Sequence, residues 1–325
     1  MFWLFVVFLA GQFDTTYHAG LVALNANDLS AAQAQLEAAA RLEPRDARVW
    51  LALAQTYRKL NQPGSAQAAA SRAEVLTSDA AILHGLALYY SEAGDGAKSA
   101  ELLRTAIRES PYTESYYFEL AQLYLKQQDF ASALEVLNSG LKNFDKSAQL
   151  ELAAGVSYYG LRRFPEAADA FLRTIDLDPG VEQPYVFLGK MLDQAEDRLP
   201  RITLAFAGFA KRAPDNYLGS FLYGKCLALQ DPARAEAQVR KSLAQNGAFW
   251  EAHFELGVLL DQRGEFAEAA KEILRSIELN PGDPVAHYRM ARLYDRLGRP
   301  DEARAERALH AKLSSAAASG MAGIK

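Results

Sequence analysis

The chain has 325 residues, of which 50% are hydrophobic and 23% charged, so it can bury a large core and lacks the composition of a disordered polyelectrolyte. Its net charge of −5 argues against a general binder of nucleic acid or of anionic membranes. A single cysteine excludes an internal disulfide framework and any cysteine-rich zinc or iron–sulfur site.

Residues 1–12 resemble the hydrophobic core of a secretory signal peptide. The run from Met1 to Ala10 is uninterrupted and apolar, with Gly11 after it, although no lysine or arginine precedes it. A membrane-spanning helix needs roughly 20 apolar residues, so this run is too short, and no later stretch approaches that length. We therefore expect a periplasmic or secreted protein. If the segment is instead an apolar cap on the first helix, we expect a cytoplasmic one.

Prolines and glycines recur along the chain with a period close to 34 residues. Pro44, Pro111, Pro179 and Pro281 are separated by 67, 68 and 102 residues. One set of glycines has spacings of 34, 35 and 33 residues: Gly155, Gly189, Gly224 and Gly257. A second set has spacings of 170 residues, which is five times 34, and of 34 residues: Gly94, Gly264 and Gly298. A fixed period of this length indicates a repeat architecture.

Each period has the pattern of two helices joined by a turn. In the first half, apolar residues lie at i, i+3, i+4 and i+7, which is one face of a helix: Trp50, Leu53, Ala54 and Tyr57. In the second half, a small residue precedes a larger apolar one by four positions, as Ala133 precedes Leu137. Carboxylates such as Asp28, Asp95 and Asp129 stand just before the second half, where they can cap a helix.

These features resemble the tetratricopeptide repeat family, whose unit is a 34-residue helix–turn–helix with the pattern W-x2-L-G-x2-Y, A-x3-F and a terminal proline. The resemblance covers residues 13–313 and implies an all-α, right-handed α-solenoid of about nine repeats. We place the units as follows: 13–46, 47–79, 80–113, 114–147, 148–181, 182–216, 217–249, 250–283 and 284–313. Residues 314–325 are small and glycine-containing, and we expect a disordered tail there.

Two units depart from the repeat pattern. The sixth contains Leu199-Pro200-Arg201, with Ile202 where a small residue is expected, and the seventh is shortened around Asp231-Pro232. We expect both to distort the stack locally.

The sequence shows no catalytic or metal-binding motif. It has no HExxH pair, GxSxG elbow, phosphate loop or Gly-rich dinucleotide turn. His253 and His287 lie one period apart, which indicates packing in the aromatic position of two repeats. Cys226 falls in a first helix with no histidine base near it in sequence, which predicts a buried structural thiol. We therefore predict no enzymatic activity, no cofactor and no metal.

The resemblance implies that the first helices line a concave groove through positions 2, 5, 9 and 12 of each repeat. Those positions give the candidate protein- or peptide-binding residues: Gln55, His84, Phe118, Gln122, Tyr159, Lys190, Phe221, Lys225, Phe254, Tyr288 and Arg292. Aromatic side chains in an exposed groove typically mark a binding surface. Lys190 and Lys225 hold the same position in adjacent repeats, so they form a short basic row that could receive a carboxylate or an acidic segment. The alternative is that the aromatics pack against neighbouring helices and the lysines are solvated.

Chaperone-binding members of the family grip a C-terminal carboxylate with a lysine–asparagine pair in the first repeat. The matching positions here are Tyr17 and Leu21, so that clamp is absent in its known form.

The sequence thus predicts a non-catalytic scaffold that binds a peptide or protein segment in the concave groove, acting in the bacterial cell envelope if residues 1–12 are a signal peptide. We expect a protein or peptide partner, with no nucleic acid and no integral membrane span. One alternative is a self-associating structural solenoid, which leaves homo-oligomerisation open. Another is a regulatory subunit of a separate enzyme, such as a glycosyltransferase.

Overall fold

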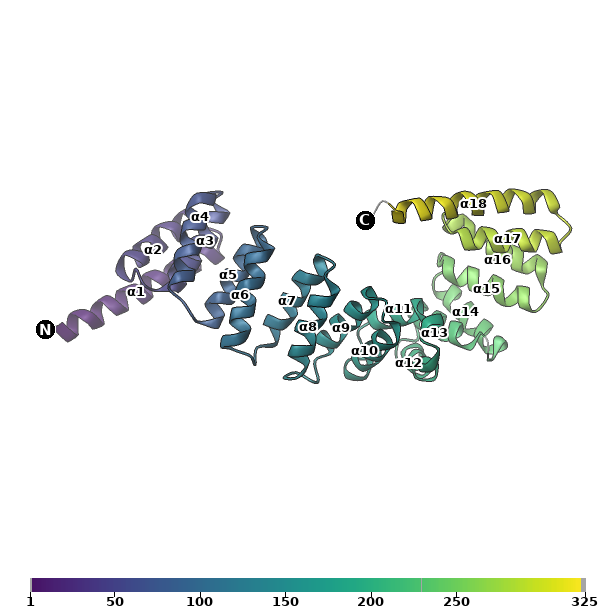
Figure 1. The fold of residues 1–325 in the computed structure, drawn as a ribbon, viewed down its shortest axis with the longest axis horizontal. Coiled ribbons are helices and arrows are strands. Elements are labelled where there is room, and N and C mark those ends of the chain that lie inside the picture. Colours follow the sequence, from purple (N-terminus) through teal and green to yellow (C-terminus); the bar gives the residue numbers. More distant parts are fainter. Residues whose placement is uncertain (1, 229, 323–325) are drawn as a thin grey trace. The chain divides into compact units, whose positions relative to one another are not determined.

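The computed structural model describes residues 2–228 and 230–322, with side chains described for residues 11–228 and 230–316. Within these residues every regular element is a helix and no strand occurs (Figure 1). The all-α class and the solenoid of helix–turn–helix repeats expected from the period are thereby confirmed. The chain divides into two compact units, unit 1 (Met1–Arg163) and unit 2 (Phe164–Lys325).

Helices that follow one another in chain order pack side by side in both units (Figure 1). Unit 1 contains α1 (Phe2–Asn25), α2 (Leu29–Leu42), α3 (Ala47–Lys59), α4 (Pro63–Val75), α5 (Ala80–Glu92), α6 (Gly96–Glu109), α7 (Glu114–Lys126), α8 (Phe130–Leu141) and α9 (Ala148–Gly160). Unit 2 contains α10 (Phe164–Leu177), α11 (Gln183–Lys190), the 3-10 helices η1 (Leu192–Gln194) and η2 (Glu196–Arg198), α12 (Leu199–Arg212), α13 (Tyr217–Leu227), α14 (Pro232–Gln245), α15 (Trp250–Gln262), α16 (Phe266–Leu279), α17 (Pro284–Arg296) and α18 (Pro300–Ala322).

Small residues let the two helices of a repeat approach closely. In unit 1, Ala133 and Leu137 of α8 are both fully buried, as the small-then-large spacing predicts. In unit 2, a methyl group placed on Gly257 of α15 would lie 2.7 Å from the Ile273 side chain and 3.1 Å from the Ala269 carbonyl oxygen, both on α16. Glycine is therefore the residue that fits this crossing.

Carboxylates cap the second helices where the sequence places them. Asp28 accepts a hydrogen bond from the Ala31 amide (3.1 Å), and Asp95 accepts one from the Lys98 amide (3.0 Å). Asp129 does the same for α8. These bonds satisfy amides that have no partner within the helix, and they fix where each second helix begins.

The turn inside a repeat ends with a residue in the left-handed region of backbone space. Seven such residues occur among those described, and most follow each other at the repeat period: Asn27, Asn61, Gly94, Gln128, Arg162, Gly264 and Gly298. Only three of them are glycines, although glycine adopts this conformation without strain. The repeat therefore adopts the left-handed turn even at Gln128 and Arg162, residue types that disfavour this backbone conformation.

Near the start of several first helices, a tryptophan, tyrosine or histidine side chain forms a hydrogen bond with the preceding loop. In each case its polar atom lies 3.0–3.1 Å from a backbone carbonyl oxygen six residues earlier: Trp50 on Pro44, Tyr117 on Pro111, Tyr185 on Pro179, His253 on Gly247 and His287 on Pro281. The two histidines also contact carboxylates of the following helix, Glu272 and Glu306. They therefore serve the packing role that their spacing indicates.

The sixth repeat is irregular, as the sequence indicates. Its first helix, α11, has eight residues and ends at Lys190, and η1 and η2 then fill the length that a regular first helix would occupy. Pro200 stands in the first turn of α12, where a proline is tolerated. In the seventh repeat α13 ends at Leu227, and Asp231 caps α14 at the Arg234 amide. Residue 229 lies outside the described residues.

Both ends of the described chain are helical. α1 begins at Phe2 and runs without a break through the segment assigned to a signal peptide, and the first of its described side chains to be buried is Phe13. We expected a disordered tail at 314–325, but α18 continues to Ala322, since its alanine-rich sequence has high helix propensity. Residues 323–325 lie outside the described residues. Across the described part of the chain, no helix combines the length and the hydropathy of a membrane span.

Candidate functional site

The first helices of unit 2 line an open cavity of 390 Å³. Its lining comes from α11, α13, α15 and the start of α17: Val186, Gly189, Lys190, Leu218, Phe221, Leu222, Lys225, Phe249, Trp250, Glu251, Phe254, Glu255, Asp283 and Val285. Four of the residues chosen from the sequence meet here: Lys190, Phe221, Lys225 and Phe254. A concave, mainly apolar site with a few polar groups is the usual form of a ligand pocket.

A second cavity, of 660 Å³, adjoins the first and shares Lys225, Phe254 and Glu255 with it. It is bordered by η1, η2 and the first residue of α12 as well as by α13, α15 and α17. The early end of α11 places these short helices beside the groove. We refer to the two cavities together as the unit 2 hollow.

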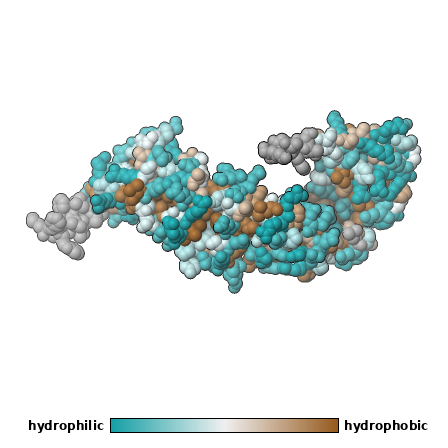
Figure 2. Space-filling view, in the orientation of Figure 1, coloured by the Kyte–Doolittle hydropathy of each residue, from teal (hydrophilic) through white to brown (hydrophobic). Residues whose placement is uncertain are grey.

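The floor of the unit 2 hollow is aromatic. Phe221 is 7% exposed, and its ring meets that of Phe249 edge to face, with 4.8 Å between ring centroids. Phe254 and Trp250 are partly buried beside it, and Val285 on the rim is 51% exposed. Hydrophobic side chains also interrupt the largely hydrophilic surface of both units (Figure 2). An ordered aromatic floor with an open rim can accept an apolar side chain from another molecule.

The charges of the hollow are mixed, because carboxylates accompany the two lysines of the expected basic row. Lys225 Nζ donates to the Gly189 carbonyl oxygen (3.1 Å) near the end of α11, so this lysine already serves the fold, while Lys190 is exposed. Arg289 is the third cation of the lining. The carboxylates of the lining outnumber these three cations: Asp193, Glu196, Glu251, Glu255 and Asp283.

Glu255 lies where the two cavities meet. Burial raises the pKa of its carboxyl group, Lys225 and Arg289 oppose that shift, and Asp193 adds to it. Burial also raises the pKa of Glu251, one turn earlier on α15. Among the described residues, the Glu255 side chain takes part in no hydrogen bond or ion pair. A partly buried carboxylate without a donor is an unfavourable arrangement in the free protein.

The two remaining candidates in unit 2, Tyr288 and Arg292, lie on α17. Tyr288 of α17 is 45% exposed, and its ring is 5.4 Å from that of His310. Arg292, one turn later, is exposed. These two side chains extend the accessible surface of α17 beyond the hollow.

The structure does not bring the candidates of unit 1 into one site. Gln122 lines a cavity of 480 Å³ between α5, α6 and α7. His84 Nε2 lies 2.7 Å from Glu119 Oε2, and its ring is 4.9 Å from that of Tyr116. Phe118 packs against the core of unit 1, and Gln55 and Tyr159 are partly buried. For Phe118, the packing alternative is the one that the structure supports.

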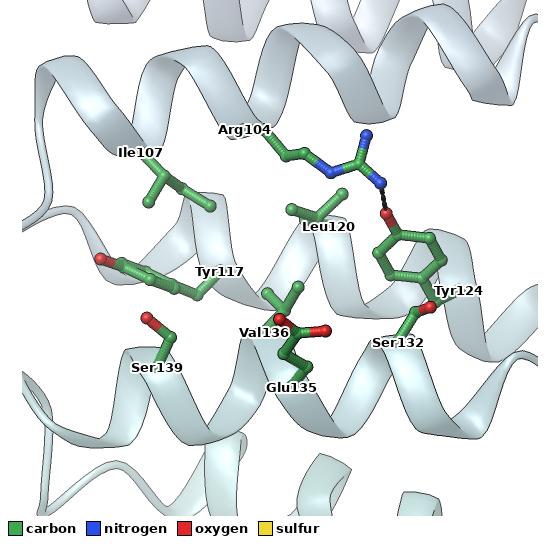
Figure 3. Close-up of a pocket in the computed structure, with 9 residues that line it drawn as sticks. All are labelled: Arg104, Ile107, Tyr117, Leu120, Tyr124, Ser132, Glu135, Val136 and Ser139. Atoms are coloured by element: carbon green, nitrogen blue, oxygen red, sulfur yellow. Dashed lines mark hydrogen bonds between the residues drawn. The ribbon is translucent and has the colours of Figure 1, made fainter.

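A different kind of cavity, of 290 Å³, lies between the second helices of two repeats in unit 1 (Figure 3). Ile107 of α6, Leu120 of α7 and Val136 of α8 supply apolar side chains to its lining. Arg104 donates a hydrogen bond to the Tyr124 hydroxyl at one end of the cavity. The sequence reading considered only first helices and did not include this site.

Sequence reasoning also missed most of the acidic lining of the hollow. Glu251 stands at position 2 of the eighth repeat, so the rule used for the other residues would have found it. Glu255 is at position 6, beside the selected Phe254. Asp193 and Glu196 lie on the two 3-10 helices, whose position depends on the early end of α11.

Cys226 is buried, and burial raises the pKa of its thiol to about 11, which agrees with the structural role expected for it. Among the described residues, no group of three or more histidine, cysteine, aspartate or glutamate side chains is arranged to hold a metal ion.

The fold and the hollow define an all-α repeat protein whose first helices carry a ligand-sized cavity. Sequence profiles described as tetratricopeptide repeat match residues 17–81, 118–182 and 227–284, and a further one matches residues 272–305. These matches cover more than half of the chain, which belongs to the tetratricopeptide repeat family. A search of curated proteins found no match.

Solved structures share the fold at low sequence identity. The C-terminal part of a repeat-containing protein from Cytophaga hutchinsonii is 13% identical, with a TM-score of 0.52, over 83% of this chain and 97% of that one. YrrB, described as having an unusual peptide-binding site, is 20% identical, with a TM-score of 0.47, over 57% and 96%. Pseudomonas aeruginosa pilF is 18% identical, with a TM-score of 0.47, over 68% and 99%.

Proposed function

We propose that the protein is a non-catalytic scaffold that holds an extended or helical segment of a partner protein in the unit 2 hollow. The observation that supports this is the aromatic floor formed by Phe221, Phe249 and Phe254, which opens to solvent at Val285. Rigid aromatic groups in a concave site provide much of the binding energy of interfaces. Membership of a repeat family whose solenoids present extended binding surfaces agrees with this role.

Site-specific photo-crosslinking in the native host tests this proposal. A photoreactive phenylalanine analogue would replace Val285 on the rim of the hollow in one variant of the full chain. In a control variant it would replace Leu204 of α12, which is 74% exposed and does not line the hollow. We expect a discrete cross-linked protein from position 285 that is absent from position 204.

The identity of the cross-linked product distinguishes the alternatives. A product made only of this chain would replace the proposal with self-association, which gel filtration would then measure. An enzyme subunit as the product would favour the regulatory role. Cross-links from position 204 alone would move the binding surface away from the hollow.

We also propose that residues 1–12 direct export. The apolar run from Met1 to Ala10, followed by the small residue Gly11, supports this. The mass of the protein recovered from the native host tests it. A mature chain that begins near residue 12 is the expected result, and a full-length intracellular chain would contradict the proposal.

A further inference from the structure

The charge pattern of the unit 2 hollow indicates what kind of segment it accepts. Its two lysines are not equally available, since Lys225 is bound to the Gly189 carbonyl oxygen at 3.1 Å. Its carboxylates come from four separate elements, namely η1, η2, α15 and the N-cap of α17, so they surround the cavities. The hollow also contains Lys190, Lys225 and Arg289, but five carboxylates outnumber these three cations, so the lining as a whole favours an incoming cation over an incoming carboxylate.

Glu255 is the carboxylate at the centre of the hollow. It lines both cavities and lies beside Phe254, the aromatic that the cavities share. Its neighbours Lys225 and Arg289 act on it through their charge, yet neither forms a hydrogen bond or ion pair with it in the described part of the chain. A cation that bound here would donate a charge-assisted hydrogen bond to this carboxylate and offset its partial desolvation.

We propose that the unit 2 hollow takes a partner segment in which a lysine or arginine side chain stands next to an apolar one, with the cation on Glu255 and the apolar group between Phe254 and Val285. This inference rests on the proposed function and specifies its partner. The chemistry is opposite to that of an acidic segment bound by Lys190 and Lys225. A binding energy shared between an aromatic floor and a single charge contact makes both parts of the segment necessary.

Three synthetic peptides serve as probes. Each is acetylated and amidated at its ends and carries a central Leu-X-Phe-X-Leu on a Gly-Ser background, where X is lysine, glutamine or glutamate. Calorimetry at low salt would measure the Kd of each peptide for the full chain and for Glu255→Gln. The matched control is Glu268→Gln, which alters an exposed glutamate of α16 that pairs with Lys271 outside the hollow.

We expect the lysine peptide to bind most tightly and the glutamate peptide most weakly. Glu255→Gln should weaken the lysine peptide about tenfold, the order expected for one charge-assisted hydrogen bond, and leave the glutamine peptide unchanged. Glu268→Gln should bind all three peptides as the unaltered chain does. Preferential binding of the glutamate peptide, or an unchanged Kd for the lysine peptide in Glu255→Gln, would overturn the inference.

Phe254→Ala separates this inference from the proposed function. If all three peptides bind equally and all are weakened by Phe254→Ala, the hollow is a binding site and the charge preference is wrong. If none of the peptides binds at millimolar concentration, the charge preference is overturned, and the cross-linking at position 285 alone decides the proposed function.

Discussion

The surroundings of Glu255 disfavour the ionised form of its carboxyl group, because the group is partly buried. Its raised pKa means that the folded state binds the proton more tightly than the unfolded state does. At pH values above the folded pKa, the ionised carboxylate therefore lowers the free energy of unfolding. The penalty shrinks as the pH falls below the folded pKa, and it is gone below the ordinary value for glutamate, where the group is protonated in both states.

Glu255→Gln is therefore expected to raise the thermal stability of the protein at pH 7. The gain should shrink as the pH is lowered towards pH 4, because the unaltered glutamate is then neutral as well. Thermal unfolding of both proteins across this pH range checks the prediction. A lower Tm for Glu255→Gln at pH 7 would contradict the prediction, because it would mean that the ionised carboxylate stabilises the free protein.

The left-handed turn residues give a second prediction at this scale. Gln128 has a φ of 59°, which strains a residue with a side chain, while Gly264 holds the equivalent place at 84° without strain. Gln128→Gly should stabilise unit 1 by about 0.5–1 kcal/mol, and Gly264→Ala should destabilise unit 2 by about 1 kcal/mol. Urea denaturation measures both. Equal effects of the same sign at the two positions would show that backbone strain is not the cause.

At the scale of the helix pair, packing leaves no room at particular crossings. A methyl group on Gly257 would contact Ile273 and the backbone of α16, whereas one on Gly64 of α4 would have nothing within 4 Å. Gly257→Ala should therefore destabilise the protein by about 1–3 kcal/mol through overpacking. Gly64→Ala should be neutral or stabilising by up to about 1 kcal/mol, since alanine favours a helix. Denaturant midpoints of the two variants should shift in opposite directions or differ clearly in size.

The short helix α11 shows how far sequence reasoning reaches at the element scale. Leu199-Pro200-Arg201 identifies the sixth repeat as irregular, because its residues do not fit the repeat pattern. The sequence does not reveal that the helix ends at Lys190, nor that η1 and η2 bring Asp193 and Glu196 to the groove. Those details depend on how η2 packs against α10 and α12, and no local pattern contains that information.

For the whole molecule, the period alone predicts the fold, because every repeat must bury the same face against its neighbours. The binding face is harder to predict, since exposure at a given repeat position varies. Phe221 is 7% exposed and Tyr288 is 45% exposed, although both hold position 5 of their repeats. The sequence therefore identifies which helices face the groove, and tertiary packing decides which of their side chains remain accessible.

The charge of the whole chain should act on a partner before contact. With a net charge of −5, the protein attracts a cationic segment over distances set by ionic screening, about 10 Å at 0.1 M salt. The association rate of the lysine peptide should therefore fall as salt is added, while that of the glutamine peptide stays nearly constant. Stopped-flow fluorescence with Trp250, which lines the hollow, would follow both reactions.

Because steering depends on the charge of the whole molecule, Glu255→Gln should leave most of this salt dependence in place while it increases the dissociation rate. A salt dependence that vanished in Glu255→Gln would instead assign the attraction to this one carboxylate.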